Sequence, residues 1–498
     1  MAFISTTFVI FLIITAAAYY ILPQRFRPAV LLLASLYFYW SASPSLLPWL
    51  LVSVSAAYLT ALAVGAAKGE RTKKLTAAAG IALLLGSLIY FKYYGFISSS
   101  VCALLGREAA NGAGSLIVPL GISFYTLQSV GYIADVRRGE IPPERNPITF
   151  AAYITFFPHI MSGPVAKASR LLPQFRDAHR FSIKTLSDGA RRFALGVFKK
   201  AVISEPFKLF VDAIYYNIAK ENPASVAAAA LLFSMQLYFD FSSYTDMALG
   251  AGKMLGFELG ENFRAPYFSK SITEIWERWH ISLTDWLREY LYFPLGGSRR
   301  GFARKLLNIA LVFLASGLWH GADWGFIVWG AIFALLRIAE ELWRKYMPSG
   351  NAGVGSRALR ILKSALSRVY VYLMWSFALI FFRLEDLSSG LAAVAKLFDF
   401  SNWSLLALNE RAYLIMMNTI DSSPAFAKTA VFVAAAFALA LLALEYRFVY
   451  RGRASTERPN DLLAQLPEGI RFALSLLMLC AALAFGFFGS SSFVYFQF

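Results

Sequence analysis

The sequence predicts an all-α polytopic membrane protein, and three observations support that prediction. The chain of 498 residues is 58% hydrophobic and only 15% charged, whereas about a quarter of the residues in a soluble domain are charged. Apolar runs recur along the whole chain. No polar stretch is long enough to fold separately, so we expect residues 1–498 to form a single integral-membrane domain.

The apolar runs predict about 11 to 13 membrane segments, because roughly 20 mostly apolar residues are needed to cross the hydrocarbon core as a helix. Some runs are too short to cross, so we expect re-entrant and amphipathic helices beside the crossing ones. The broken segment at residues 156–180 is one such place, and it predicts irregular backbone buried in protein. The main apolar runs are residues 8–20, 29–38, 77–90, 227–237, 306–318, 430–444 and 472–488.

The net charge of +17 is explained by membrane topology. Basic residues are expected in short cytoplasmic loops, where they also attract anionic lipid. No nucleic-acid-binding motif is present, so we expect no nucleic-acid partner. The clusters assigned to such loops include Arg137/Arg138, Arg191/Arg192, Lys199/Lys200 and Arg299/Arg300.

Residues 271–290 predict one amphipathic helix, either at the membrane interface or folded under the helix bundle, because two stripes follow helical spacing. Pro294 and the following glycines would end it. The polar stripe is Arg278, Ser282, Asp285 and Glu289, and the aromatic stripe beside it is Trp279, Leu283, Trp286 and Tyr290.

A histidine lies where an apolar helix ends. The 15 residues from Lys305 to His320 give about 22 Å of helix, less than the ~30 Å of the hydrocarbon core. We therefore expect the tip at residues 320–323 to lie within the depth of the membrane, surrounded by protein or water. His320 suits a general base or proton shuttle that acts on a hydroxyl. The alternative is a histidine that stabilises the helix's end carbonyls.

Two other places carry polar groups that are costly in a membrane. His280 suits a second acid/base or a group that orients substrate, or else it is a satisfied interfacial histidine. Residues 235–246 place Asp240, Tyr244 and Asp246 in an otherwise apolar helix. These side chains would line a substrate tunnel, or they would form a buried polar knot between helices.

Signatures of several enzyme classes are absent from the sequence. It contains no Walker A loop, no Gly-x-Gly-x-x-Gly, no Gly-x-Ser-x-Gly and no His-Glu-x-x-His. Cys102 and Cys480 make no metal-binding or redox spacing. Nucleotide, metal and serine-hydrolase chemistry are therefore disfavoured, and we expect no metal site.

Four blocks together resemble the membrane-bound O-acyltransferase family over nearly the whole chain. Residues 268–297 hold a Trp-His pair and end in Pro-Leu-Gly-Gly, and residues 316–321 end in Trp-His-Gly. Residues 240–246 and the C-terminal residues 493–498 also fit. Within the family, the chain is most similar to the bacterial alginate and peptidoglycan O-acetyltransferase membrane subunits. The D-alanyl transfer protein of teichoic acid modification is more distant.

The resemblance implies a ring of helices around a central tunnel, with His320 as the essential histidine and His280 as the second motif histidine. It implies an O-acyltransferase of the bacterial inner membrane that uses acetyl-coenzyme A or another cytoplasmic acyl thioester. The acceptor would be an extracytoplasmic polysaccharide such as alginate or peptidoglycan, reached through a serine-hydrolase-like partner protein. No permanently bound cofactor is implied.

Further residues take roles around that tunnel. Trp279, Trp286 and Trp319 would wall it and exclude water, which limits thioester hydrolysis. Asp240, Tyr244 and Asp246 would line or brace it.

Two alternatives stay open. A secondary transporter would use Asp240, Asp246 and His320 as a proton relay, although no repeat pairs the two halves of the chain as in many transporters. An O-acyltransferase that acts on a lipid or a protein is the other.

Overall fold

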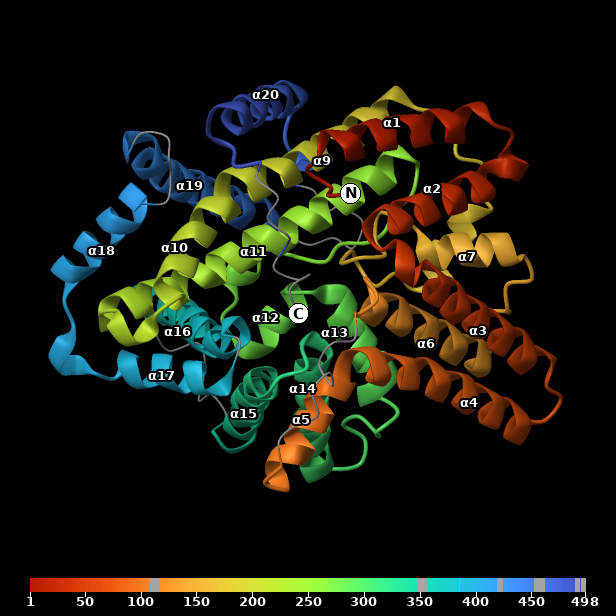
Figure 1. Ribbon diagram of the computed structural model, residues 1–498, viewed down its shortest axis with the longest axis horizontal. Coiled ribbons are helices and arrows are strands. Elements are labelled where there is room, and N and C mark those ends of the chain that lie inside the picture. Colours follow the sequence, from red (N-terminus) through yellow and green to blue (C-terminus); the bar gives the residue numbers. More distant parts are fainter. Residues whose placement is uncertain are drawn as a thin grey trace. The chain divides into compact units, whose positions relative to one another are not determined.

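The computed structural model shows a helical protein. It describes residues 1–107, 117–347, 357–384, 386–418, 424–451, 462–488 and 493. Within these ranges the regular structure consists of helices, and no β-strand occurs among them (Figure 1). The all-α fold class is therefore confirmed.

Seven helices in the described part of the chain are long and apolar enough to cross a membrane, so the protein is multi-pass. Two shorter apolar helices accompany them, Thr6–Ile21 and Leu387–Leu397. The expected 11 to 13 segments include such shorter pieces, and that number stays a prediction. The seven are Pro44–Ala66, Glu70–Leu104, Pro223–Met254, Phe302–His320, Arg357–Arg383, Val431–Tyr450 and Glu468–Phe485.

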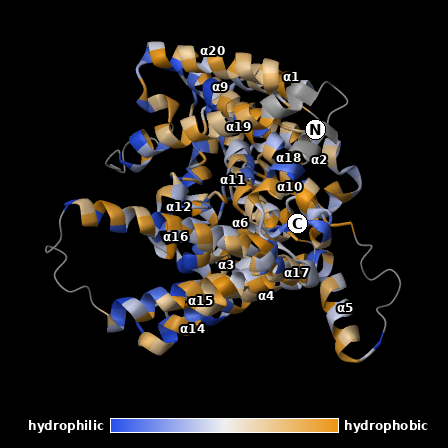
Figure 2. Ribbon diagram, turned by 90° about the vertical axis from the view of Figure 1, so that its left-hand side faces the viewer, coloured by the Kyte–Doolittle hydropathy of each residue, from blue (hydrophilic) through white to orange (hydrophobic). Residues whose placement is uncertain are grey.

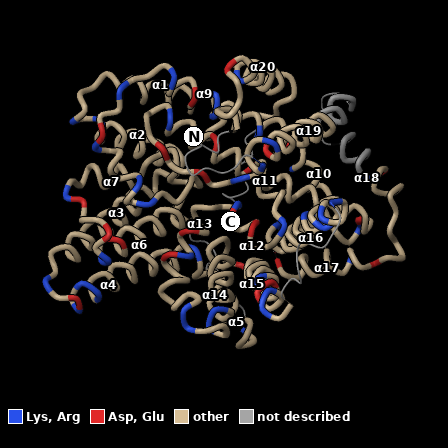
Figure 3. Tube along the Cα trace, turned by 180° about the vertical axis from the view of Figure 1, so that it is seen from behind, with Lys and Arg blue, Asp and Glu red and all other residues tan. Residues whose placement is uncertain are grey.

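Hydrophobic side chains face outward on these helices. Figure 2 shows hydrophobic residues along α14 (Phe302–His320) and α20 (Glu468–Phe485). Leu307 on α14 and Leu483 on α20 are exposed. Apolar surface of this extent marks contact with another phase or molecule, and lipid is that phase for a membrane helix. Charged residues lie at the start of α4 (Glu70–Leu88), as Figure 3 shows.

The chain divides into two compact units. The first comprises Met1–Phe193 and Tyr244–Gly260, and the second comprises Ala194–Ser243 and Glu261–Phe498. Helices α9 (Ile183–Phe198) and α11 (Pro223–Met254) contribute residues to both. The single domain over residues 1–498 stays a prediction.

The first unit packs its helices around an irregular buried segment, which is the first part of the one predicted at residues 156–180. The later part departs from that prediction, because it forms the short helix α8 (Ala168–Leu171) and exposes side chains such as Arg170 and Arg176. Residues 156–166 follow α7 without forming a helix and are buried throughout. The Ser35 hydroxyl accepts a hydrogen bond from the Phe157 backbone N–H at 3.0 Å. The helices are α1 (Thr6–Ile21), α2 (Arg27–Ala42), α3 (Leu47–Ala66), α4, α5 (Tyr94–Leu104), α6 (Ile122–Arg138), α7 (Pro147–Thr155) and α8 (Ala168–Leu171).

The second unit has an aromatic core. The ring of Trp276 lies 5.3 Å from Trp375 and 5.8 Å from Trp329, between centroids. Such edge-to-face pairs add to the stabilisation from area burial alone. Its further helices are α10 (Glu205–Tyr215), α12 (Ile272–Arg278), α13 (Ile281–Leu287), α14, α15 (Trp324–Tyr346), α16 (Arg357–Arg383), α17 (Leu387–Leu397), α18 (Leu405–Asn418), α19 (Pro424–Leu444) and α20.

The prediction of one amphipathic helix over residues 271–290 is wrong. The chain forms α12, turns at His280, forms α13 and continues as a π-helical turn, Arg288–Tyr292. His280 has a left-handed backbone with φ of 44°. The Ile281 N–H donates to the carbonyl oxygen of Asn262 at 3.0 Å. A partner 19 residues earlier thus replaces a helical hydrogen bond, so the continuous polar stripe does not form.

The assignment of two basic clusters to short loops is also wrong. Arg192 lies on α9, and Lys199 and Lys200 lie on a π-helical turn, Lys199–Ser204; all three are buried. Buried charges are found paired, because an isolated one is too costly to desolvate. Each has a carboxylate partner: Arg192 with Asp246 at 3.1 Å, Lys199 with Glu445 at 3.9 Å and Lys200 with Asp240 at 2.6 Å.

Helices α14 and α15 form a hairpin whose backbones approach closely. A Cβ added to Gly317 on α14 would overlap the carbonyl oxygen of Phe326 on α15. A Cβ added to Gly330 on α15 would lie 2.5 Å from the carbonyl oxygen of Phe313 on α14. Small residues that let backbones meet are typical of membrane helix pairs, and here they fix the position of the α14 C-terminus.

We expect Gly317→Val to force the hairpin apart. Overpacking of this kind lowers the free energy of unfolding by about 1–3 kcal/mol. Thermal unfolding of the purified protein in detergent measures the effect. Gly86→Val on α4 is the matched control, because a Cβ there has no atom within 4 Å. Equal melting temperatures for the two variants would contradict the packing account.

Candidate active site

His320 is the last residue of α14 and lies buried at the tip of the hairpin, with 5% of its surface exposed. Asp323 caps α15, because its Oδ1 accepts a hydrogen bond from the Gly325 N–H at 2.7 Å. Between them, a Cβ on Gly321 would overlap the Phe326 ring, so the turn needs glycine. Residues 320–323 therefore form the tip that the sequence predicts, and close packing holds His320 in place.

His280 lies beside His320. The centroids of the two imidazole rings are 6.4 Å apart, and the ring planes meet at 61°. His280 is completely buried. The Trp319 ring is 5.8 Å from His280 and 4.9 Å from His320. The second unit thus brings together the two histidines that the sequence singles out.

Aromatic rings surround the histidine pair. Trp329 and Phe382 lie 5.0 and 5.2 Å from the His320 ring, and Phe241 lies 4.8 Å from the His280 ring. Rings packed this closely leave an environment with little water. Such a dry site strengthens electrostatic interactions and limits hydrolysis of a reactive ester.

The three predicted tunnel tryptophans occupy different environments. Trp319 touches both histidines, and Trp279 is buried next to His280, with its ring 4.8 Å from Trp375. Trp286 is only half-buried, and its ring contacts Tyr290 at 5.1 Å. Trp279 and Trp319 therefore lie near the histidine pair, while a role for Trp286 stays a prediction.

Burial also sets the protonation of His280, which lies outside the seven candidate spans. Desolvation lowers the pKa of His280 to about 3, because the charged imidazolium loses its hydration. The ring is therefore neutral at physiological pH. A neutral imidazole has one donor and one acceptor nitrogen, which suits a hydrogen-bonding role.

Asp240 belongs to a buried ion cluster of the second unit. Its Oδ1 lies 2.6 Å from the Lys200 Nζ and accepts from the Ser204 hydroxyl at 3.4 Å. Lys200 also pairs with Glu205 at 2.6 Å. Of the two roles predicted for Asp240, these contacts favour a buried polar group that holds helices together over a side chain that lines a tunnel. The reason is that its carboxylate already has a cationic partner.

Tyr244 and Asp246, which the sequence groups with Asp240, belong to the first unit. The Asp246 Oδ1 accepts from the Nε and Nη2 of Arg192 at 3.2 and 3.1 Å. Tyr244 is buried, with its ring 4.8 Å from that of Phe3. Both residues therefore pack inside the first unit, whereas the histidine pair belongs to the second.

Neither Asn262 nor Lys200 is indicated as a site residue by the sequence patterns. Asn262 contacts His280 but lies in an aperiodic stretch, where no pattern distinguishes it from a surface residue. Lys200 did leave a signal, since two adjacent lysines interrupt the otherwise apolar residues 193–203. Charges inside an apolar run predict an internal partner at least as well as a loop.

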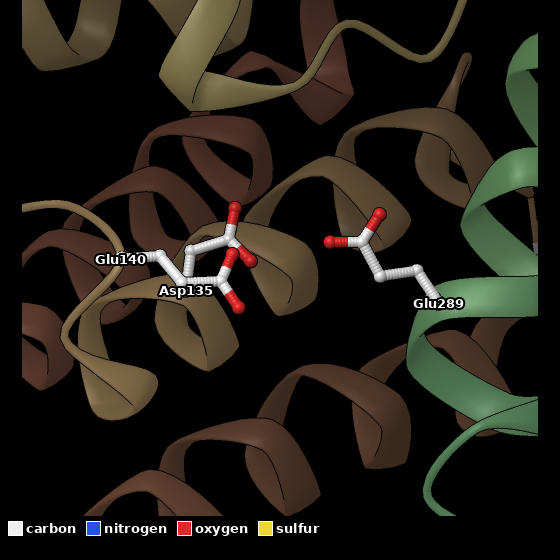
Figure 4. Close-up of side chains that lie close together, drawn as sticks. All are labelled: Asp135, Glu140 and Glu289. Atoms are coloured by element: carbon white, nitrogen blue, oxygen red, sulfur yellow. The ribbon is translucent and has the colours of Figure 1, made fainter.

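Carboxylates also gather within the first unit. Asp135 and Glu140 lie side by side at the C-terminal end of α6 (Figure 4), and Glu140 pairs with Arg138 at 3.5 Å. Glu289, also labelled in Figure 4, belongs to the second unit, and we assign no metal site across the two units. The expectation that the protein has no metal site stays a prediction.

Comparisons with known proteins point to one family. The family model described as MBOAT, membrane-bound O-acyltransferase family, matches residues 137–383. The chain is 38% identical to a probable alginate O-acetylase AlgI of Pseudomonas syringae pv. tomato, over 87% of this chain and 82% of the relative. The protein of that name from Pseudomonas putida is 35% identical over the full length of both. A peptidoglycan O-acetyltransferase of Helicobacter pylori is 30% identical over 94% and 91%.

Proposed function

The chain belongs to the membrane-bound O-acyltransferase family, and we propose that it supplies acetyl groups for O-acetylation of an extracytoplasmic polysaccharide such as alginate or peptidoglycan. The names of the alginate and peptidoglycan relatives support this acceptor class. The donor is a cytoplasmic acyl thioester, acetyl-coenzyme A, used as substrate with no permanently bound cofactor. The enzyme works in the bacterial inner membrane.

The observation that carries the proposal is the buried pair of histidines at the end of α14. His320 acts as the general base: it takes the proton of the acceptor hydroxyl while that oxygen attacks the thioester carbonyl. The carbon–sulfur bond then breaks, and the leaving thiolate takes the proton back from the imidazolium. Products are one ester and one thiol. Positioned acid–base catalysis of this kind contributes about 10²–10⁴ in rate.

The neighbouring residues support this chemistry. His280, neutral and 6.4 Å from His320 between ring centroids, orients the reacting groups. Trp279 and Trp319 help keep water from the thioester. Asp240 and Asp246 brace the helices through Lys200 and Arg192.

A partner protein with a serine-hydrolase-like fold makes the final transfer to the polymer. The basis is the resemblance of this chain to bacterial polysaccharide O-acetyltransferase subunits, together with the depth expected for His320. Family membership argues against the transporter alternative. A lipid or protein acceptor is the competing O-acyltransferase function.

A panel of donors and acceptors tests the proposal. Purified protein in liposomes is given radiolabelled acetyl-coenzyme A or a long-chain acyl-coenzyme A, with alginate, peptidoglycan glycan strands or no polymer. We expect thiol release from the acetyl donor and alkali-labile label on a glycan, with the candidate partner protein present. Label that accumulates on lipid or on added protein, independent of glycan, would favour the competing acceptor. No thiol release from any thioester would refute acyl transfer.

A further inference from the structure

Asn262 holds His280 and its neighbours through both its side chain and its backbone. Its side chain is completely buried. The Oδ1 atom accepts from the Ser282 backbone N–H at 3.2 Å and from the Ser282 hydroxyl at 2.9 Å. The same oxygen lies 3.2 Å from the His280 Nδ1, and the Asn262 carbonyl oxygen accepts from the Ile281 N–H at 3.0 Å. Three consecutive residues are therefore fixed by one asparagine.

The hydrogen-bond pattern determines which imidazole nitrogen carries the proton. The backbone nitrogen of Ser282 can only donate, so the amide atom facing it is the oxygen and not the nitrogen. That oxygen can only accept, so the Nδ1 of His280 must be the donor. A neutral imidazole has one N–H, and the lone pair is then on Nε2.

From this geometry we propose that Asn262 is a positioning residue, which holds His280 as the Nδ1–H tautomer and leaves Nε2 as its basic nitrogen. The inference rests on the proposed function only for the statement that the histidine pair takes part in acyl transfer. The sequence motifs assigned neither a role to Asn262 nor a tautomer to His280.

The backbone at His280 supports a positioning role. His280 and Ala265 are the two non-glycine residues with positive φ in the described ranges, at 44° and 47°. A left-handed backbone is strained for a residue with a bulky side chain, and it persists only where the surroundings determine it. The contacts of Asn262 to His280, Ile281 and Ser282 are such surroundings, and both strained residues lie close to it in the chain or in space.

The presence of asparagine rather than aspartate at position 262 also supports this role. The Nδ2 of Asn262 is buried and has no hydrogen-bond partner within the described ranges, and an unsatisfied buried donor lowers the stability of the folded protein. Aspartate would avoid that cost, because it has no N–H to satisfy. It would, however, place a negative charge beside the imidazole and favour imidazolium. Asparagine keeps the acceptor and leaves His280 neutral.

Nitrogen solid-state NMR on histidine-labelled protein in lipid bilayers tests the proposal directly. The chain has four histidines, and the spectrum of His280→Ala identifies the His280 signals by difference. At neutral pH we expect a protonated Nδ1 and an unprotonated Nε2 in the native protein. Asn262→Ala should redistribute the proton between the two nitrogens. Asn308→Ala is the matched control, since Asn308 is equally buried in the same unit but donates to the Gly297 carbonyl at 2.9 Å.

Kinetics give the second readout. We expect Asn262→Ala to lower kcat for thiol release by roughly tenfold or more, with KM changed less than about twofold, because the general acid–base step is affected and donor binding is not. Asn262→Asp keeps the oxygen acceptor, so it should retain the Nδ1–H bond even if Asn262→Ala does not fold.

The outcomes separate this inference from the proposed function. A native His280 protonated at Nε2, or charged at neutral pH, would overturn it whatever the enzyme's activity. An unchanged His280 spectrum in Asn262→Ala would remove the role of Asn262. If the native protein has the Nδ1–H tautomer but releases no thiol from any donor, the proposed function fails and the assignment to Asn262 stands.

Discussion

Replacing His320 with alanine is expected to lower thiol release from acetyl-coenzyme A by about 10²–10⁴-fold, the range that a positioned general base contributes. The reason is local: the imidazole is the group that takes the hydroxyl proton, and it ends a packed helix with aromatic rings on several sides. Continuous thiol detection with the protein in liposomes measures the effect.

His179→Ala is the control for that experiment. His179 is half-buried in the first unit, where its Nδ1 lies 2.8 Å from the Tyr19 hydroxyl oxygen. Its loss should leave thiol release within about threefold, because the proposed proton transfer uses groups of the second unit and His179 belongs to the first. If His320→Ala retained as much activity as His179→Ala, another residue would have to be the base.

Lys200→Met is expected to have the largest effect on stability. Lys200 is fully buried between Asp240 and Glu205, with Nζ 2.6 Å from each carboxylate. Removing one member of a buried ion cluster leaves uncompensated charge and costs about 3–5 kcal/mol. The expected result is a large fall in the melting temperature of the detergent-solubilised protein, or failure to recover folded protein.

Two further variants make the reason testable. Lys73→Met breaks an exposed pair on α4, where the Glu70 side chain is 85% exposed, and should change stability by less than about 1 kcal/mol. A triple variant, Lys200→Met with Asp240→Asn and Glu205→Gln, removes all three charges of the cluster. It should regain part of the stability that Lys200→Met loses, because no net charge then stays buried. Equal melting temperatures for Lys200→Met and Lys73→Met would contradict the buried-cluster account.

Features fixed by local composition could be predicted from the sequence. The apolar runs gave the helical membrane fold, and the short arms around residues 320–323 gave the hairpin tip. His320 was singled out because an ionisable group at the end of an apolar helix is costly wherever it lies. Each of these depends on neighbours in the chain, which a sequence displays directly.

Features fixed by distant partners could not be predicted in this way. Helical spacing over residues 271–290 carries no sign of Asn262, whose hydrogen bonds break the helix at His280. Lys200 was assigned to a basic loop because the sequence pattern does not show its carboxylate partners, Asp240 and Glu205, which lie on other helices. Asp240 and Asp246 lie on one helix only six residues apart in the sequence, yet they pair within different units.

Transfer of an acyl group across the membrane through His320 is tested most directly by a sidedness measurement. Proteoliposomes of defined orientation receive radiolabelled acetyl-coenzyme A on one side only, while the partner protein and glycan are confined to the other. We expect acetyl ester on the glycan side, thiol on the donor side, and neither with His320→Ala. Ester that forms only when donor and glycan share one side, or transfer that persists in His320→Ala, would contradict the account.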